Sequence, residues 1–189
     1  MYSLLIEIST KKSLLAINKN DLSIKKYNNF DNKNIFFIIK NLLKNTNLTL
    51  KDLSFIAFGK GPGSFTSIRI AASIAKTLSY SLDIPLISFS SLKSFIPKID
   101  GPFLSIIDCK SNGIYCIKGD KNKKNILYTS NTKIISLDKL KNFLQLKYTI
   151  LSFNGFFNSI ETDPNENHLA KISFQKFKNQ KFSKLELCY

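Results

Sequence analysis

The residues best suited to bind a ligand lie in a glycine-rich segment, residues 59–69, which reads GKGPGSFTSIR. A short apolar segment, residues 55–58, precedes it, and a long segment of helical periodicity follows it. A strand, a glycine-rich turn and a helix N-terminus in this order can present backbone N–H groups to an anion such as phosphate. The turn is therefore the first candidate for a binding site.

The turn does not have the residue spacing of the known phosphate-binding motifs. A Walker-type loop ends in Gly-Lys-Ser/Thr, whereas Lys60 precedes the turn here, and the Gly-x-Gly-x-x-Gly dinucleotide spacing is absent. Pro62 also removes one N–H donor. We therefore favour a structural role, in which the glycines permit tight turning and close packing while Ser64 caps the helix. An enzyme that binds ATP at this turn is the main alternative.

Other catalytic groups are sparse. His168 is the single histidine, so no pair of imidazoles can hold a metal ion, and no Ser–His or Cys–His pair has a compelling placement. We expect His168 to lie on the surface at the start of a helix. Asp108 ends a predicted strand, and we assign it to stabilising the Asn112–Gly113 turn rather than to catalysis. The sequence predicts no catalytic residue and no metal site, and a peptidase is the weakest alternative.

Composition restricts the possible classes of protein. The chain has 189 residues, 43% of them hydrophobic, and no apolar run reaches the roughly 18 residues of a membrane span, so we expect a soluble protein. Residues 1–7 lack a basic leader, which argues against a secretory signal. Three scattered cysteines are too few for a disulfide framework, and we expect a cytoplasmic protein.

The net charge of +15 raises the alternative of an RNA-binding module. Only one of the 28 basic residues is an arginine, however, and the lysines are spread along the whole chain. Such lysines more often form a solvated surface than a surface that recognises a nucleic acid.

Apolar periodicity and turn residues predict an alternation of strands and helices. Strands are expected at residues 2–9, 13–17, 22–27, 55–58, 86–89, 103–108, 114–118, 126–129 and 148–153. Helices are expected at residues 32–45, 64–81, 137–146 and 168–178, with a short helix after residue 89. The segment after Gly101-Pro102 repeats the opening strand–turn–strand pattern, so we place two domains at residues 1–100 and 101–189.

Two of the helices carry more apolar surface than one sheet can bury. On the first, Phe37 lies nearly opposite the apolar stripe and should point away from the sheet. On the second, the apolar arc is wider than a single sheet contact, and its small residues permit close approach of another helix. The arc contains Phe65, Ile68, Ile70, Ala71, Ala72, Ile74, Ala75 and Leu78. A partner protein explains this width, and complete burial within one chain is the alternative.

The segment GPGSFTSIR, residues 61–69, resembles the Gly-Pro-Gly-Ser-Phe-Thr-Gly-x-Arg signature of the TsaB (YeaZ) family. The resemblance also covers residues 5–10, residues 107–115 and the closing Glu186-Leu-Cys-Tyr189. The sequence departs from the family pattern in Glu7, where the family has Asp, in Ser67, where it has Gly, and in stopping at Tyr189. The family motif turn would comprise Gly59, Gly61, Pro62, Gly63, Ser64, Phe65, Thr66 and Arg69.

The resemblance implies an α/β fold of the actin-like ATPase, or ribonuclease-H-like, type, with two βαβ-type halves of which the second is reduced. In that superfamily an Asp-x-Gly-Thr segment grips phosphate, and the matching residues here are Glu7-Ile-Ser-Thr10. A side chain at Ser9 would hinder close approach of phosphate to the backbone, so we expect no nucleotide hydrolysis. No cofactor is expected, although weak nucleotide binding at a subunit interface is left open.

The resemblance also implies a function. The chain would be a non-catalytic scaffold subunit required for threonylcarbamoyl transfer to the adenosine 3′ of the anticodon in tRNAs reading codons that begin with A. Its partners would be the threonylcarbamoyltransferase catalytic subunit and a small P-loop ATPase, with tRNA contacted through the complex and self-pairing when the chain is alone. Partner-binding residues would be Phe36, Phe37, Lys40, Ile70, Ser73, Ile74 and Thr77.

Overall fold

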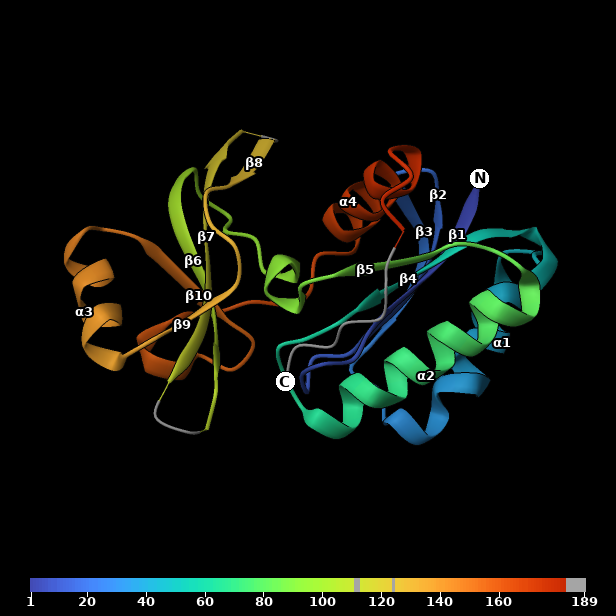
Figure 1. Ribbon diagram of the computed structural model, residues 1–189, viewed down its shortest axis with the longest axis horizontal. Coiled ribbons are helices and arrows are strands. Elements are labelled where there is room, and N and C mark those ends of the chain that lie inside the picture. Colours follow the sequence, from blue (N-terminus) through green and yellow to red (C-terminus); the bar gives the residue numbers. More distant parts are fainter. Residues whose placement is uncertain (111–112, 124, 183–189) are drawn as a thin grey trace. The chain divides into compact units, whose positions relative to one another are not determined.

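The computed structural model describes residues 1–110, 113–123 and 125–182, which form two compact units (Figure 1). One unit comprises Met1–Ser91 together with the chain from Asn165 onward, and the other comprises Leu92–Pro164. The expected Asn112 turn, Cys188 and the closing segment 186–189 lie outside the described residues.

The first unit is built on a five-stranded sheet in the order β3-β2-β1-β4-β5. Strands β1 (Tyr2–Glu7), β2 (Leu14–Lys19) and β3 (Leu22–Asn28) form an antiparallel meander, while β4 (Leu53–Gly59) and β5 (Leu86–Phe89) run parallel to β1. The central strands are buried on both faces, which explains their nearly continuous apolar sequences.

Helices cover both faces of this sheet (Figure 1). Helices α1 (Ile35–Asn45) and α2 (Phe65–Leu82) pack on the face that carries Leu4 and Ile6. Helix α4 (Glu166–Lys178) packs on the opposite face, which carries Leu5. Because strand side chains alternate between faces, β1 contributes to both cores. Short 3₁₀ turns precede α1 at Asn32–Asn34 and β4 at Leu50–Asp52.

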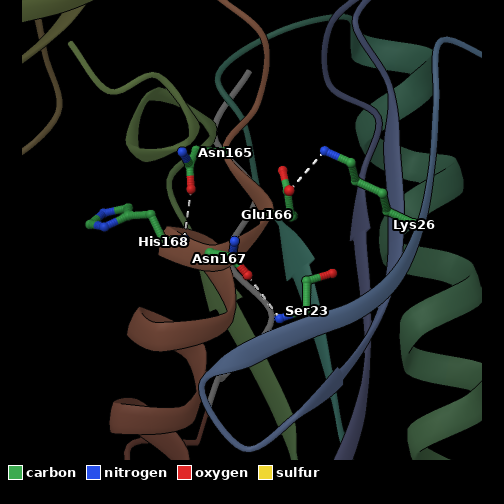
Figure 2. A network of polar contacts seen from close by, with 6 residues as sticks. All are labelled: Ser23, Lys26, Asn165, Glu166, Asn167 and His168. Atoms are coloured by element: carbon green, nitrogen blue, oxygen red, sulfur yellow. Dashed lines mark hydrogen bonds and ion pairs between the residues drawn. The ribbon is translucent and has the colours of Figure 1, made fainter. Parts of the chain in front are cut away.

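Polar contacts fasten the start of α4 to the edge strand β3 (Figure 2). The Ser23 backbone N–H donates to Asn167 Oδ1 at 3.0 Å, and Lys26 Nζ lies 2.7 Å from Glu166 Oε1. The Asn165 side chain caps the helix by accepting from the His168 backbone N–H at 2.9 Å. His168 therefore lies at the start of a helix as predicted, and its side chain is half-buried.

The second unit contains a sheet in the order β11-β10-β6-β7-β8, with β9 paired to β7. Its strands are β6 (Gly101–Asp108), β7 (Ile114–Asn122), β8 (Asn125–Tyr128), β9 (Lys133–Ile135), β10 (Thr149–Ser152) and β11 (Ile160–Glu161). Helix α3 (Leu137–Gln145) covers one face, and Leu92 and Phe95 pack against the other. Among the described residues this unit has one α-helix where the first has three.

The division into units differs from the expected boundary at residue 101 in two respects. Residues 92–100 belong to the second unit, because Leu92 and Phe95 are buried in its core. The chain returns to the first unit at Asn165, because the apolar face of α4 is buried against β2, β4 and β5. The short strands β9 and β11 are likewise not predicted by the sequence. Across the described chain, no helix combines the length and the apolar character needed to cross a membrane.

Candidate partner interface and glycine turn

The glycine turn connects β4 to α2 in the predicted manner. Gly59 ends β4, and α2 begins at Phe65, with Ser64 as its N-cap. The Ser64 hydroxyl accepts from the Ser67 backbone N–H at 3.5 Å. Ser67, which departs from the family pattern, accepts through its own hydroxyl a hydrogen bond from Asn32 Nδ2 at 3.0 Å. This substitution therefore links the start of α2 to the turn before α1 and leaves the helix start intact.

Backbone N–H groups of the turn donate to the protein itself. Lys60 N–H donates to the Phe89 carbonyl at 2.9 Å, and Ser64 N–H donates to the Ser9 carbonyl at 2.7 Å. Gly61 N–H donates to Ser91 Oγ at 3.2 Å, and the Gly61 carbonyl accepts from Ser91 N–H at 2.8 Å. Pro62 has no N–H to offer. An anion would have to displace these bonds to use the same donors, so the geometry favours the structural role.

The glycines are required by close approach to the end of β1 and the segment after it. A Cβ atom on Gly59 would collide with the Glu7 carboxylate and would lie 2.8 Å from Ser91 Oγ. A Cβ atom on Gly63 would collide with the Ser9 carbonyl oxygen, and Gly63 has a φ of +155°. Both positions therefore exclude a side chain because the turn packs directly on residues 7–9.

Glu7 lies at the centre of this packing and is 1% exposed. Its Oε1 accepts from the backbone N–H of Ser9 at 2.9 Å and from the Ser9 hydroxyl. Burial raises the pKa of the Glu7 carboxyl above its ordinary value, while hydrogen bonds from Ser9 and Ser91 act in the opposite direction. The sequence gives no signal for Ser91, because its contact with the turn spans thirty residues.

The outer face of α1 and α2 carries exposed aromatic and basic side chains. Phe36 and Phe37 are 69% and 67% exposed, so the predicted outward direction of Phe37 is confirmed. On α2, the Arg69 guanidinium lies 3.9 Å from the centre of the Phe65 ring, and that ring is itself half-exposed. An open hollow of about 370 Å³ is lined by Phe65, Thr66, Arg69, Ile70 and Ser73. Lys40, Ser73 and Thr77 are also exposed.

Ile70 and Ile74 are less exposed than the sequence predicts. Ile74 is only 8% exposed and joins the core shared by α1, α2 and the sheet, and Ile70 is half-buried at the edge of that core. Burial within one chain therefore accounts for most of the apolar arc of α2, including Ala71, Ala72 and Ala75. The exposed part of this face is aromatic and basic, and the aliphatic centre of the predicted face lies inside the protein.

The remaining candidate groups within the described ranges are Asp108, Cys116 and the potential metal ligands. Among the residues that the structure describes, no three His, Cys, Asp or Glu side chains lie close enough to hold a metal ion. Asp108 is exposed, and its Oδ1 accepts from the Lys110 backbone N–H at 2.8 Å, as expected of a turn-stabilising carboxylate. Cys116 is buried, and burial raises the pKa of its thiol.

Comparison with known proteins identifies similar sequences and folds. Residues 31–189 match a family model described as TsaD, tRNA N6-adenosine threonylcarbamoyltransferase. The chain is 40% identical over 125 residues to the tRNA threonylcarbamoyladenosine biosynthesis protein TsaB of Buchnera aphidicola subsp. Acyrthosiphon pisum, covering 61% of this chain and 56% of that protein. It is 34% identical over 122 residues to the Bacillus subtilis protein of the same name, covering 61% and 53%.

A solved structure matches over a greater length. YeaZ from Pseudomonas aeruginosa has a TM-score of 0.79 and 15% identity, with 97% of each chain covered. This likeness shows that the chain shares the α/β fold of that structure. In sequence, the chain matches about half the length of its curated TsaB relatives.

Proposed function

Because the chain belongs to the family described as tRNA N6-adenosine threonylcarbamoyltransferase and its sequence is similar to TsaB proteins, we propose that it is a scaffold subunit for this tRNA modification. It would support transfer of threonylcarbamoyl to the adenosine 3′ of the anticodon in tRNAs reading codons that begin with A. The chain itself would perform no bond-making step. A threonylcarbamoyltransferase catalytic subunit would be its direct partner, and a small ATPase and tRNA would join through the complex.

The exposed aromatic surface on α1 and α2 is the observation that carries this proposal. Phe36 and Phe37 stand next to each other on α1, more than three fifths exposed, and α2 adds Phe65. Large aromatic side chains gathered on a helical surface are typical anchors of protein interfaces. Burying them against partner helices would hold the catalytic subunit in its active arrangement.

The glycine turn supports a scaffold more than a nucleotide enzyme. The N–H groups of Lys60, Gly61 and Ser64 in the turn donate to protein acceptors. Glu7 and Ser9 fill the side of the turn where a phosphate would approach the end of β1. Titration calorimetry with ATP should therefore give no tight binding by the isolated chain, and a micromolar dissociation constant would favour the enzyme alternative.

Phe37→Glu tests the interface directly. The substitution places a charge where an aromatic anchor should be buried, so affinity for the catalytic subunit of the same organism should fall at least about tenfold. Leu127→Glu is the matched control, because Leu127 is also 67% exposed but lies on β8 of the second unit. Binding is measured by calorimetry with full-length proteins. Equal affinity of the two variants would remove α1 from the proposed interface.

A further inference from the structure

The outer surfaces of α1 and α2 carry positive charge without any negative charge. Helix α1 contains Lys40 and Lys44, helix α2 contains Arg69 and Lys76, and neither helix contains Asp or Glu. All four basic side chains are exposed. Net charge of the whole chain does not require this arrangement, since α3 and α4 both combine acidic and basic residues.

The charges lie among the exposed aromatic rings. At about 100° per residue, Phe36, Lys40, Lys44 and Phe37 fall within an arc of about 100° on α1. On α2, the quadrant that begins at Phe65 also contains Arg69, Ser73, Lys76 and Tyr80, and Tyr80 is 89% exposed. The two helices pack against the same face of the sheet (Figure 1). Each thus presents a stripe in which rings supply contact area and cations surround them.

This distribution bears on the choice between a second copy and a different protein. In a twofold pair the same surface contacts itself, so the four cations of one copy would face the four of the other. Like charges brought together in an interface oppose binding, and opposite charges favour it. A surface of this composition therefore fits a partner whose facing helices carry Asp and Glu better than it fits itself.

We propose that the outer face of α1 and α2 selects an acidic helical surface, and thereby selects the catalytic subunit over self-pairing. This proposal depends on the scaffold function above and adds the chemistry by which the partner is recognised. RNA would also be attracted to cations and rings. Exposed Phe36 and Phe37 and the largely apolar hollow beside Phe65 favour packed side chains over a phosphate backbone, which needs densely spaced cations.

The test is a double charge reversal, Lys40→Glu with Lys76→Glu. The matched control is Lys139→Glu with Lys171→Glu, which reverses one exposed lysine on each of α3 and α4. Affinity for the catalytic subunit is measured by calorimetry at 50 and 300 mM salt, and self-association by analytical ultracentrifugation. Thermal melts establish that each variant is folded.

We expect the α1–α2 double variant to bind the catalytic subunit at least about tenfold more weakly at low salt, with a smaller loss at high salt, because salt screens the charges. Its self-association should increase, because the face then carries both signs. Sedimentation separates a defined dimer from the heterogeneous aggregates that a misfolded protein would form. The control should match the wild type in both measurements.

Three outcomes separate the proposals. Unchanged binding by the charge-reversed variant, together with weak binding by Phe37→Glu, would overturn the charge selection and leave the scaffold function standing. Unchanged binding by both would overturn both. Tight, steeply salt-dependent binding of the isolated chain to tRNA, lost in the α1–α2 variant and not displaced by the catalytic subunit, would assign the face to RNA instead.

Discussion

The first strand of each sheet ends in a carboxylate, but the surroundings of the two carboxylates differ. Glu7, the last residue of β1, accepts a hydrogen bond from the backbone N–H two residues later, and Asp108, the last residue of β6, does the same. Glu7 is buried beneath the glycine turn, whereas Asp108 is exposed. A carboxylate that ends a strand thus organises the local turn in both units, and in the first unit it also supports a distant loop.

The difference lies in what is packed on top of each strand end. In the first unit, Gly59 contacts Glu7, Gly63 contacts Ser9, and Ser91 bonds the backbone of Gly61. The glycine turn and the N-terminus of α2 are therefore fixed relative to β1. The corresponding end of β6 instead carries Gly113 near Ile134, which is 59% exposed. The first strand end sets the position of helix α2, and the second closes a hairpin.

Substitution of the glycine at each strand end should give the largest difference in the free energy of unfolding between the two sites. Gly59→Ala places a methyl group against the Glu7 carboxylate and Ser91, both enclosed, so we expect a loss of about 2 to 3 kcal/mol in the free energy of unfolding. Gly113→Ala is the control, because its Cβ would meet the Ile134 side chain, which can move aside. Urea denaturation should give a cost below about 1 kcal/mol there. Equal costs would mean that the first turn is not tightly packed.

Removing the charge of the buried carboxyl should change how stability depends on pH. The pKa of Glu7 is raised from 4.5 by burial, so the folded protein retains this proton over a range where the unfolded chain loses it. Stability contributed by the neutral form is fully present below pH 4.5 and is lost as pH rises through the elevated pKa of the folded state. Glu7→Gln should abolish this decline, and urea midpoints between pH 4 and 8 measure it.

Ser9→Ala should change the pKa of the Glu7 carboxyl without removing the carboxyl. The Ser9 hydroxyl donates to Glu7 Oε1 and lowers its pKa, so removing the hydroxyl should move the decline to higher pH. A decline that stays in place in Ser9→Ala, or that persists in Glu7→Gln, would assign it to another group.

Sequence patterns predict the helices of the first unit well, but they do not predict which of their side chains the same chain buries. Helical spacing predicted α2 to within one residue at each end, and it predicted that Phe37 points outward. The burial of Ile74 could not be predicted, because an angular projection gives the width of an apolar arc but not whether a neighbouring helix of the same chain covers it. Periodicity also gives no signal for the contact of Ser91 with the glycine turn, which joins segments far apart in the sequence.

The division into units could not be predicted for the same reason, because local patterns do not show which core buries a segment. Gly101-Pro102 is a strong local signal for a break, and a strand does begin there. Membership of a unit depends on which core buries a segment, however, and that is a property of packing. Helix α4 joins the first unit through Leu169 and through Phe177, whose ring stacks on Phe55 with centroids 4.7 Å apart.

The smallest expected effect concerns the open strand end itself. Asp108→Ala removes a single exposed hydrogen bond, from the Lys110 backbone N–H, and water can satisfy that donor in its place. The free energy of unfolding should fall by less than about 1 kcal/mol. Ser9→Ala, by comparison, leaves a buried carboxyl short of a donor and should cost about 1 to 3 kcal/mol at neutral pH. Urea denaturation of both variants measures the difference, and a cost at Asp108 equal to that at Ser9 would mean that the two strand ends are supported alike, whatever is packed above them.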